Sequence, residues 1–348
     1  MAFVRRDAKS VRLFSIDIPD LGDVTFSVDF VATNNSNAKN PVSAIYADYC
    51  ASFPIREDDT RSPSEYVKIF GNALVILSFL FRQAITLHGW TQMRSGLRES
   101  HWINPLSLNS TPSDRVEHED SVVSIDELEK LSQDMLRVYL NEDNKLRKLV
   151  EHLSVAVSPH IEQQTPDAFT FMFSAFEKVV DFEYRKNKNK AKNAADCILV
   201  DYLERMREEI RGTDEDEKLE VIKRVDGFIQ SVKNGRPSFG LKLSALLQAY
   251  PVLDAYTSDL WPVEGAGKLP GLKEIRNKLA HESGAAINHQ SLAVAAWHLS
   301  VLIERLICVL LNVQLPRNIS PQSHMLCRNN WYKRVYWEKL RCETNKSS

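Results

Sequence analysis

The sequence predicts a mainly helical protein with a small β-rich amino-terminal region, an α+β fold class. Two periodicities predict it: apolar residues alternate within the first fifty or so residues, whereas they recur every three to four residues from about residue 124 to 315. The chain has 348 residues, of which 43% are hydrophobic and 26% charged, with 12 glycines and 14 prolines. These values are typical of a globular protein and exclude a disordered or collagen-like chain.

The amino-terminal strands are predicted from alternation. Residues 11–16 and 24–30 place apolar side chains at every second position, and the turn residues around Gly22 lie between them. A third apolar segment, 42–50, is a candidate for a further strand. The sequence therefore predicts a small antiparallel sheet at the start of the chain.

The period changes to that of a helix after a polar stretch. Apolar residues recur at helical spacing over residues 66–81, and Ser62 or Ser64 would cap this helix. Residues 89–120 contain prolines and no sustained period, so we expect an irregular linker there. We accordingly expect a β-rich domain with one helix and a linker over residues 1–120.

The remainder reads as helices followed by a basic and aromatic tail. We expect a helical domain over residues 121–316 and the tail over 317–348. A loop with two glycines, 262–270, interrupts the helical domain. The expected helices span residues 126–156, 166–183, 194–210, 217–232, 241–253, 271–281 and 288–313.

Cysteine usage, charge and hydropathy restrict the class of protein. The formal net charge of −2 excludes a globally basic nucleic-acid binder. The longest apolar stretch, 73–81, is too short to cross a membrane, and no secretory signal follows the first arginines. We expect a cytoplasmic protein that does not bind membranes. The cysteines are isolated, a pattern that favours reduced thiols over disulfides or zinc: Cys50, Cys197, Cys308, Cys327 and Cys342.

The segment 272–284 carries the residues best suited to chemistry. Its apolar residues recur at helical spacing and would bury one face, while Asn277 and His281, four residues apart, share another face. Arg276 can reach the same point from the flank. Arginine binds phosphate bidentately, and histidine titrates near neutral pH. The three residues therefore suit acid–base cleavage of a phosphodiester without a metal or cofactor.

Context distinguishes this segment from other Arg–His pairs of similar spacing in the chain. A loop containing proline and glycine precedes it, asparagine follows the arginine directly, and a long apolar helix comes after it. With this context, residues 276–281 resemble the motif of the HEPN (higher eukaryotes and prokaryotes nucleotide-binding) superfamily. The aromatic helix 169–183, in which Glu177 follows Phe176, carries the same resemblance. The β-rich head followed by a helical domain is most similar to the ApeA-type proteins.

The resemblance implies a helical-bundle core, dimerisation that brings two copies of the motif together, and metal-independent endoribonuclease activity. In the implied mechanism a ribose 2′-hydroxyl attacks the adjacent phosphate. His281 would move a proton, Arg276 would stabilise the developing charge, and Asn277 would hold the imidazole or a phosphate oxygen. Many relatives are toxins or act in antiviral defence by abortive infection. Such an enzyme needs restraint, for example by a regulatory protein, and a phage-derived trigger could release it.

Other features have a functional and a plainer interpretation. Glu177 and Asp181 share a helical face and could orient the catalytic groups, or could be solvated or paired structurally. A catalytically inactive adaptor that binds RNA or protein is the alternative function. The candidate RNA-binding cations, which could equally lie in a solvated loop, are Arg185, Lys186, Lys188, Lys190, Lys192 and Lys278.

Three charged or titratable residues of the long helix 288–313 have plain structural expectations. We expect His298 to be partly buried with its hydrogen-bonding capacity satisfied. Glu304 and Arg305 are expected at an exposed edge, with a buried ion pair across a dimer interface as the alternative.

Overall fold

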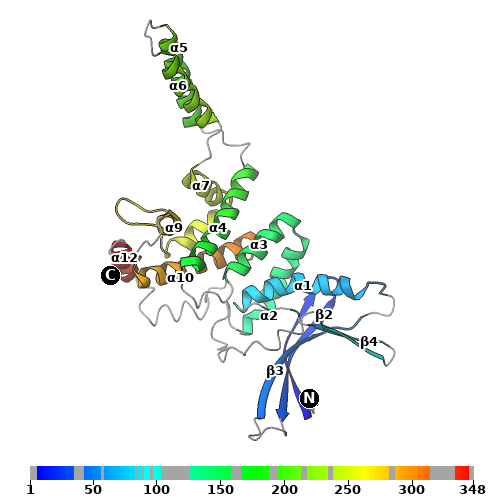
Figure 1. Cartoon of the computed structure of the whole chain (residues 1–348). Helices are drawn as coiled ribbons and strands as arrows, with labels where there is room; N and C mark the ends of the chain where they lie inside the picture. Colours follow the sequence, from blue (N-terminus) through cyan, green and yellow to red (C-terminus); the bar gives the residue numbers. More distant parts are fainter. Residues whose placement is uncertain are drawn as a thin grey trace. The chain divides into compact units, whose positions relative to one another are not determined.

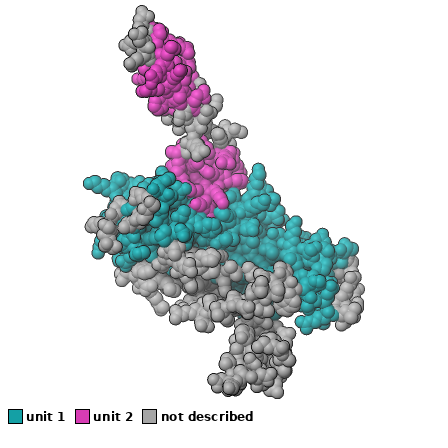
Figure 2. Space-filling model, in the orientation of Figure 1, with its two compact units in different colours: residues 1–173, 259–348 teal, residues 174–258 magenta. Residues whose placement is uncertain are grey.

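The computed structural model is mostly helical with a small amino-terminal antiparallel sheet, as the sequence predicted (Figure 1). Two compact units are formed by residues 1–173 with 259–348 (unit 1) and by residues 174–258 (unit 2) (Figure 2). The structure describes residues 6–34, 43–55, 59–82, 85, 87, 89–94, 97–102, 125–157, 166–187, 194–212, 218–233, 238–281, 287–313 and 334–344.

The strands are β1 (Arg6–Ile18), β2 (Gly22–Asn34), β3 (Ser43–Ser52), β4 (Gly89–Arg94) and β5 (Leu97–Trp102). The helices are α1 (Pro63–Leu80), α2 (Ile125–Asn141), α3 (Asn144–Val157), α4 (Pro166–Asn187), α5 (Ala194–Arg211), α6 (Lys218–Lys233), α7 (Phe239–Ala249), α8 (Pro251–Thr257), α9 (Leu272–His281), α10 (His289–Leu310) and α12 (Arg334–Glu343).

The first sheet has the order β1-β2-β3, with both pairs antiparallel. Ile18 pairs with Gly22 across the tight turn, in which Asp20 and Gly22 adopt positive φ angles of 71° and 79°. Glycine and aspartate tolerate this left-handed backbone region better than most residues. The two predicted strands and the candidate third strand are confirmed.

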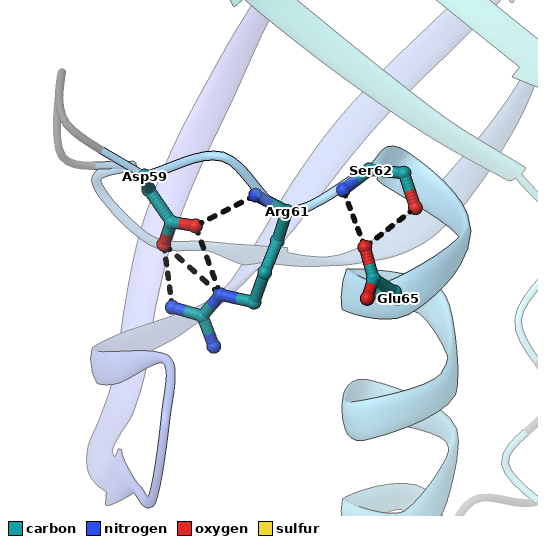
Figure 3. Close-up of polar contacts among 4 residues, drawn as sticks. All are labelled: Asp59, Arg61, Ser62 and Glu65. Carbon is teal, nitrogen blue, oxygen red and sulfur yellow. Dashed lines mark hydrogen bonds and ion pairs between the residues drawn. The ribbon is translucent and has the colours of Figure 1, made fainter.

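Polar contacts determine where α1 begins. The Glu65 carboxylate accepts hydrogen bonds from the backbone N–H and the hydroxyl of Ser62, at 2.7 and 2.8 Å (Figure 3). Ser62, one of the two predicted caps, therefore precedes the first helical turn. Just before it, hydrogen bonds from the Arg61 side chain and backbone hold the pKa of the Asp59 carboxyl well below its usual range.

Aromatic rings attach α1 to the sheet. Phe14 of β1 and Phe26 of β2 stack on each other, with ring centroids 4.8 Å apart. Phe14 also stacks on Phe81 at the end of α1 and Phe26 on Phe70 within it, at 6.0 and 6.2 Å. Such ring pairs add to the stabilisation that burial provides. In unit 1, α2 packs on β1 and on α1, and α1 packs on α3.

The long helix α10 forms the centre of unit 1. It contacts α3, α9 and α12, and almost all of its side chains are buried. Among the described helices, α10 is the one long and apolar enough to cross a membrane by composition. Its burial within the protein is the environment of a core helix. Asn288 caps its first turn by accepting hydrogen bonds from Gln290 and Ser291 backbone N–H groups.

The expectation that Glu304 and Arg305 lie at an exposed edge is wrong. Both are buried, and each binds an oppositely charged residue of the same chain. Arg82 donates to Glu304 through Nε at 2.5 Å and Nη2 at 2.7 Å. Arg305 donates to Asp259 through Nη1 at 2.6 Å and Nη2 at 3.2 Å. Burial is tolerated because each guanidinium meets its carboxylate with two hydrogen bonds.

Several expected boundaries also differ. The linker expected over 89–120 begins with the antiparallel hairpin β4–β5, in which Trp90 stacks on His101 with centroids 4.3 Å apart. The helix expected over 126–156 is two helices, because Asp143 accepts a hydrogen bond from Leu146 N–H and caps α3. The helix expected over 241–253 divides at Pro251, which lacks the N–H needed to continue it and instead begins α8.

Unit 2 contains α4 from residue 174 onward and helices α5 to α8. Lys242 of α7 binds Asp181 at 2.6 Å, Tyr250 donates to the buried Glu183 at 3.2 Å, and α5 packs on α6. The two units differ from the three expected parts, 1–120, 121–316 and 317–348. Because α2 packs on β1 and α12 packs on α10, elements from all three expected parts lie in unit 1, whereas α5 to α8 lie in unit 2.

We predict that Glu304→Ala lowers the free energy of unfolding by about 3 kcal/mol, because it leaves the Arg82 guanidinium buried without this carboxylate. Urea denaturation measures the change. The matched control is Glu338→Ala, which removes an exposed pair with Arg334 and should change stability by less than about 0.5 kcal/mol. The double variant Arg82→Met/Glu304→Leu should regain most of the loss. Equal stability of Glu304→Ala and the wild type would contradict the prediction.

Candidate functional site

A compact loop, residues 262–271, precedes α9. The Glu274 carboxylate, in the first turn of α9, accepts hydrogen bonds from the backbone N–H groups of Gly265 and Gly271, both at 2.8 Å. A side chain at Gly271 would place its Cβ 2.5 Å from the backbone of Glu264, so the loop closes only with glycine at this position. The beginning of α9 is thereby tied to the loop.

A second set of contacts holds the same loop from outside. The carbonyl oxygen of Pro270 accepts hydrogen bonds from the Trp261 indole at 3.1 Å and from Arg341 Nε at 2.8 Å. Arg341 Nη2 also donates to the Leu269 carbonyl at 3.3 Å, and its guanidinium lies 5.8 Å from the Trp337 ring centroid. Helix α12 therefore fixes the entry to α9. Burial lowers the pKa of Arg341, yet arginine remains charged in proteins.

His298 of α10 supports this arrangement from the core. Its Nδ1 accepts a hydrogen bond from the Trp261 backbone N–H at 3.0 Å, and its ring meets those of Trp261 and Trp337 edge to face. Burial is the main cause that lowers the pKa of His298 to about 4; the charge of Asp259 opposes this shift and that of Arg305 adds to it. The expected structural role of His298 is confirmed only in part: Nδ1 accepts a hydrogen bond, but burial is almost complete, and within the described residues the buried Nε2 has no hydrogen-bond partner.

The three predicted catalytic residues lie on α9. Leu272 and Ile275 are buried and attach the helix to the core, as predicted, whereas Leu279, the third apolar residue expected on this face, is only half-buried. Arg276 and Asn277 are half-buried, and Arg276 Nη1 donates to Asn277 Oδ1 at 3.2 Å. His281 is exposed and is the last residue of α9. The helix is thus anchored at its beginning and presents an imidazole at its end.

Helical geometry determines which of these groups share a face. Asn277 and His281 are four residues apart, so they lie about 40° apart around the axis. Arg276 and His281 are five residues apart, or about 140°. The hydrogen bond from Arg276 to Asn277 joins the guanidinium to the face that carries the imidazole. The three side chains therefore form a row in which Asn277 is the middle member.

The supporting residues have different surroundings. Glu177 and Asp181 are half-buried on α4 in unit 2, and Asp181 binds Lys242 there at 2.6 Å. The lysine gives Asp181 a structural partner of its own, in agreement with the plainer interpretation. Their predicted role toward α9 stays a prediction.

The candidate RNA-binding cations are only partly within the described residues. Arg185 and Lys186 are exposed in the last turn of α4, and Lys186 lies 3.9 Å from the buried Glu183. Lys278 is half-buried on α9. Three further lysines of the run lie outside the described residues: Lys188, Lys190 and Lys192.

Sequence reasoning missed the residues that position α9. Glu274 was detectable in principle, because an acidic residue in the third helical position binds the N–H of a cap residue in many helices. Trp261 and Arg341 gave no such signal, since their shared acceptor, the Pro270 carbonyl, is a backbone group. Within the described residues, no group of three or more His, Cys, Asp or Glu side chains is arranged to hold a metal ion.

Comparisons with protein-family models, with characterised proteins and with solved structures found no match to this chain.

We predict that Arg341→Met loosens the start of α9. Methionine retains apolar contact with Trp337 but cannot donate to Pro270 and Leu269, so the free energy of unfolding should fall by about 2 kcal/mol. Hydrogen exchange at the Leu272 amide, which is bonded to the Pro262 carbonyl, should quicken. The exposed Arg334→Met is the control. Unchanged protection of this amide would show that Arg341 does not hold the loop.

We predict that stability rises with pH between about 4 and 6.5 because of His298. In this range the unfolded histidine binds a proton that the folded one does not, so acidification favours unfolding, by about 3 kcal/mol at most. Protonation of Nδ1 would also remove the acceptor of the Trp261 N–H. In urea titrations at several pH values, His298→Asn should have a smaller pH dependence, whereas the exposed His289→Asn should match the wild type. A full wild-type slope in His298→Asn would refute this.

Proposed function

We propose that this chain is a HEPN-type endoribonuclease that cleaves RNA without a metal, acts in the cytoplasm and has a helical-bundle catalytic domain. The observation that supports the proposal is the arrangement of α9. Its buried start is held by the loop and by α12, while its end exposes His281 on the same face as Asn277. A rigid support for an exposed imidazole is what acid–base catalysis requires.

The proposed reaction needs a proton carrier and a cation. The ribose 2′-oxygen attacks the neighbouring phosphorus, the bond from phosphorus to the 5′-oxygen breaks, and the 2′-hydroxyl proton is transferred away as the 5′-oxygen gains one. His281 moves one of these protons, and Arg276 stabilises the charge on the phosphorane oxygens. The products are a 2′,3′-cyclic phosphate and a 5′-hydroxyl. The requirement for a 2′-hydroxyl restricts the reaction to RNA.

A second copy of the chain fits this chemistry. The backbone positions of Arg276 and His281 lie about 140° apart around α9, so within one copy only the long Arg276 side chain, held by Asn277, brings the guanidinium toward the face of the imidazole. Two copies of α9 facing each other would supply an imidazole and a guanidinium to one phosphate. We therefore include a homodimer, or a higher oligomer, in the proposal. A role as a toxin or in antiviral defence, restrained by a regulatory protein and released by a phage-derived trigger, is the biological setting that the sequence resemblance suggests.

The test is cleavage of a single-stranded RNA in the presence of a metal chelator. We predict that His281→Ala lowers the cleavage rate by about 10²- to 10⁴-fold and retains the wild-type circular dichroism spectrum. The control is His289→Ala, because His289 is also exposed and lies at the start of α10. The wild-type product should carry a 2′,3′-cyclic phosphate. Cleavage that requires an added divalent metal and survives His281→Ala would remove the mechanism.

A non-catalytic adaptor is the second candidate function. The exposed apolar side chains of Ile198 on α5 and Leu219 on α6 favour it, because such side chains mark interaction surfaces. Absence of cleavage by the wild type, with RNA or protein binding unaffected by His281→Ala, would support the adaptor.

A further inference from the structure

Helices α5 and α6 of unit 2 form a hairpin (Figure 1). Apolar side chains lie on its surface. Val225 and Ile229 of α6 are buried, and they define the side of the helix that faces α5. Several larger side chains are not buried there. The exposed fractions are 44% for Leu199, 58% for Tyr202, 40% for Val221 and 63% for Phe228.

These exposed residues lie on one side of the hairpin. In α6, Phe228 directly precedes the buried Ile229. In α5, the half-buried Met206 directly precedes Arg207, which faces α6 and binds Asp226 at 3.1 Å. In two antiparallel helices, the positions that precede the contact residues of each helix lie on the same side of the pair. The stripes 199–206 of α5 and 221–228 of α6 therefore form one apolar face.

The two helices carry opposite charge. Helix α5 has five carboxylates and three guanidiniums, a net charge of −2, whereas α6 has four cationic side chains and two carboxylates, a net charge of +2. Two hairpins can stack face to face in several ways. If a two-fold axis parallel to the helices relates the two copies, each α5 packs against the α6 of the second copy. These two helices are antiparallel and carry opposite net charge. A rotation that places α5 against α5 would oppose like charges.

We propose that two copies of this chain associate through this face, forming a four-helix bundle in which each α5 packs on the α6 of the second copy. All neighbouring helices in such a bundle are antiparallel, which is a common arrangement of four-helix bundles. The inference concerns the second copy alone and does not depend on the cleavage chemistry.

The register of the hairpin identifies a charge pair between the copies. Arg207 binds Asp226, so residues 207 and 226 lie at the same position along the hairpin axis. Because the helices are antiparallel, residue 209 lies level with residue 224 in the same way. Rotation about the two-fold axis leaves this position unchanged. Glu209 of one copy therefore lies beside Arg224 of the second copy, at the edge of the apolar face. The bond of Arg224 to Glu220 in its own helix is exposed and does not compete strongly.

The available area suits a dimer of moderate strength. Helices of 18 and 16 residues give a face about 25 Å long and about 20 Å wide, or about 500 Å² per copy. The sum for two copies, about 1,000 Å², is near the lower limit for a specific protein interface. We expect a dissociation constant on the order of 1 µM.

Sedimentation equilibrium of the full chain tests the proposal. The wild type should dimerise, and Phe228→Glu should weaken dimerisation by at least about 100-fold, since it buries a carboxylate in the apolar face. The matched control is Leu219→Glu, because Leu219 is 68% exposed on the same helix. It comes directly after a position that faces α5, so it lies on the side of the hairpin opposite to Phe228. Circular dichroism checks that both variants fold.

A charge exchange tests the arrangement of the helices. Glu209→Arg and Arg224→Glu should each weaken dimerisation, and the double variant should restore it, because the exchanged charges attract again. A monomeric wild type, a Phe228→Glu variant that dimerises like the wild type, or a double variant no better than the single ones would overturn the proposal. A chain that dimerises in this way without cutting RNA would retain this inference and remove the proposed function.

Discussion

The candidate site depends on the carbonyl oxygen of Pro270. This one acceptor receives an indole N–H from Trp261 and a guanidinium N–H from Arg341, two residues that lie far apart in the sequence. Trp261 is in turn held by His298 of the core helix α10. The position of α9 is consequently determined by the core and by α12 together. Residues at the exposed end of α9 can therefore be substituted without removing the contacts that hold the beginning of the helix.

The local sequence predicts elements whose stabilisation is itself local. The turn at Gly22 and the cap at Ser62 each involve neighbours within a few positions, and these predictions are confirmed. Breaks inside helical periods were missed at Asp143 and Pro251, since the apolar repeat continues through both. A periodic pattern records which face is buried and does not show whether one helix or two supply it.

Contacts between distant residues were beyond sequence reasoning. Glu304 and Arg305 lie in an apolar stretch, where an exposed edge is the simplest way to avoid burying a charge. Their partners, Arg82 and Asp259, come from other parts of the chain, and nothing in the local pattern identifies them. The same holds for the candidate site: the sequence placed Arg276, Asn277 and His281 on one helix, but the supports of that helix emerged only from the structure.

The order in which the chain is synthesised gives the contact of α12 a further meaning. A ribosome delivers α9 and α10 before Arg341, so during translation the loop ahead of α9 lacks two of its hydrogen bonds until α12 has emerged. For a protein proposed to cut RNA, this delay would keep the nascent chain from acquiring a fully ordered cleavage centre beside the ribosomal and messenger RNA from which it is being made.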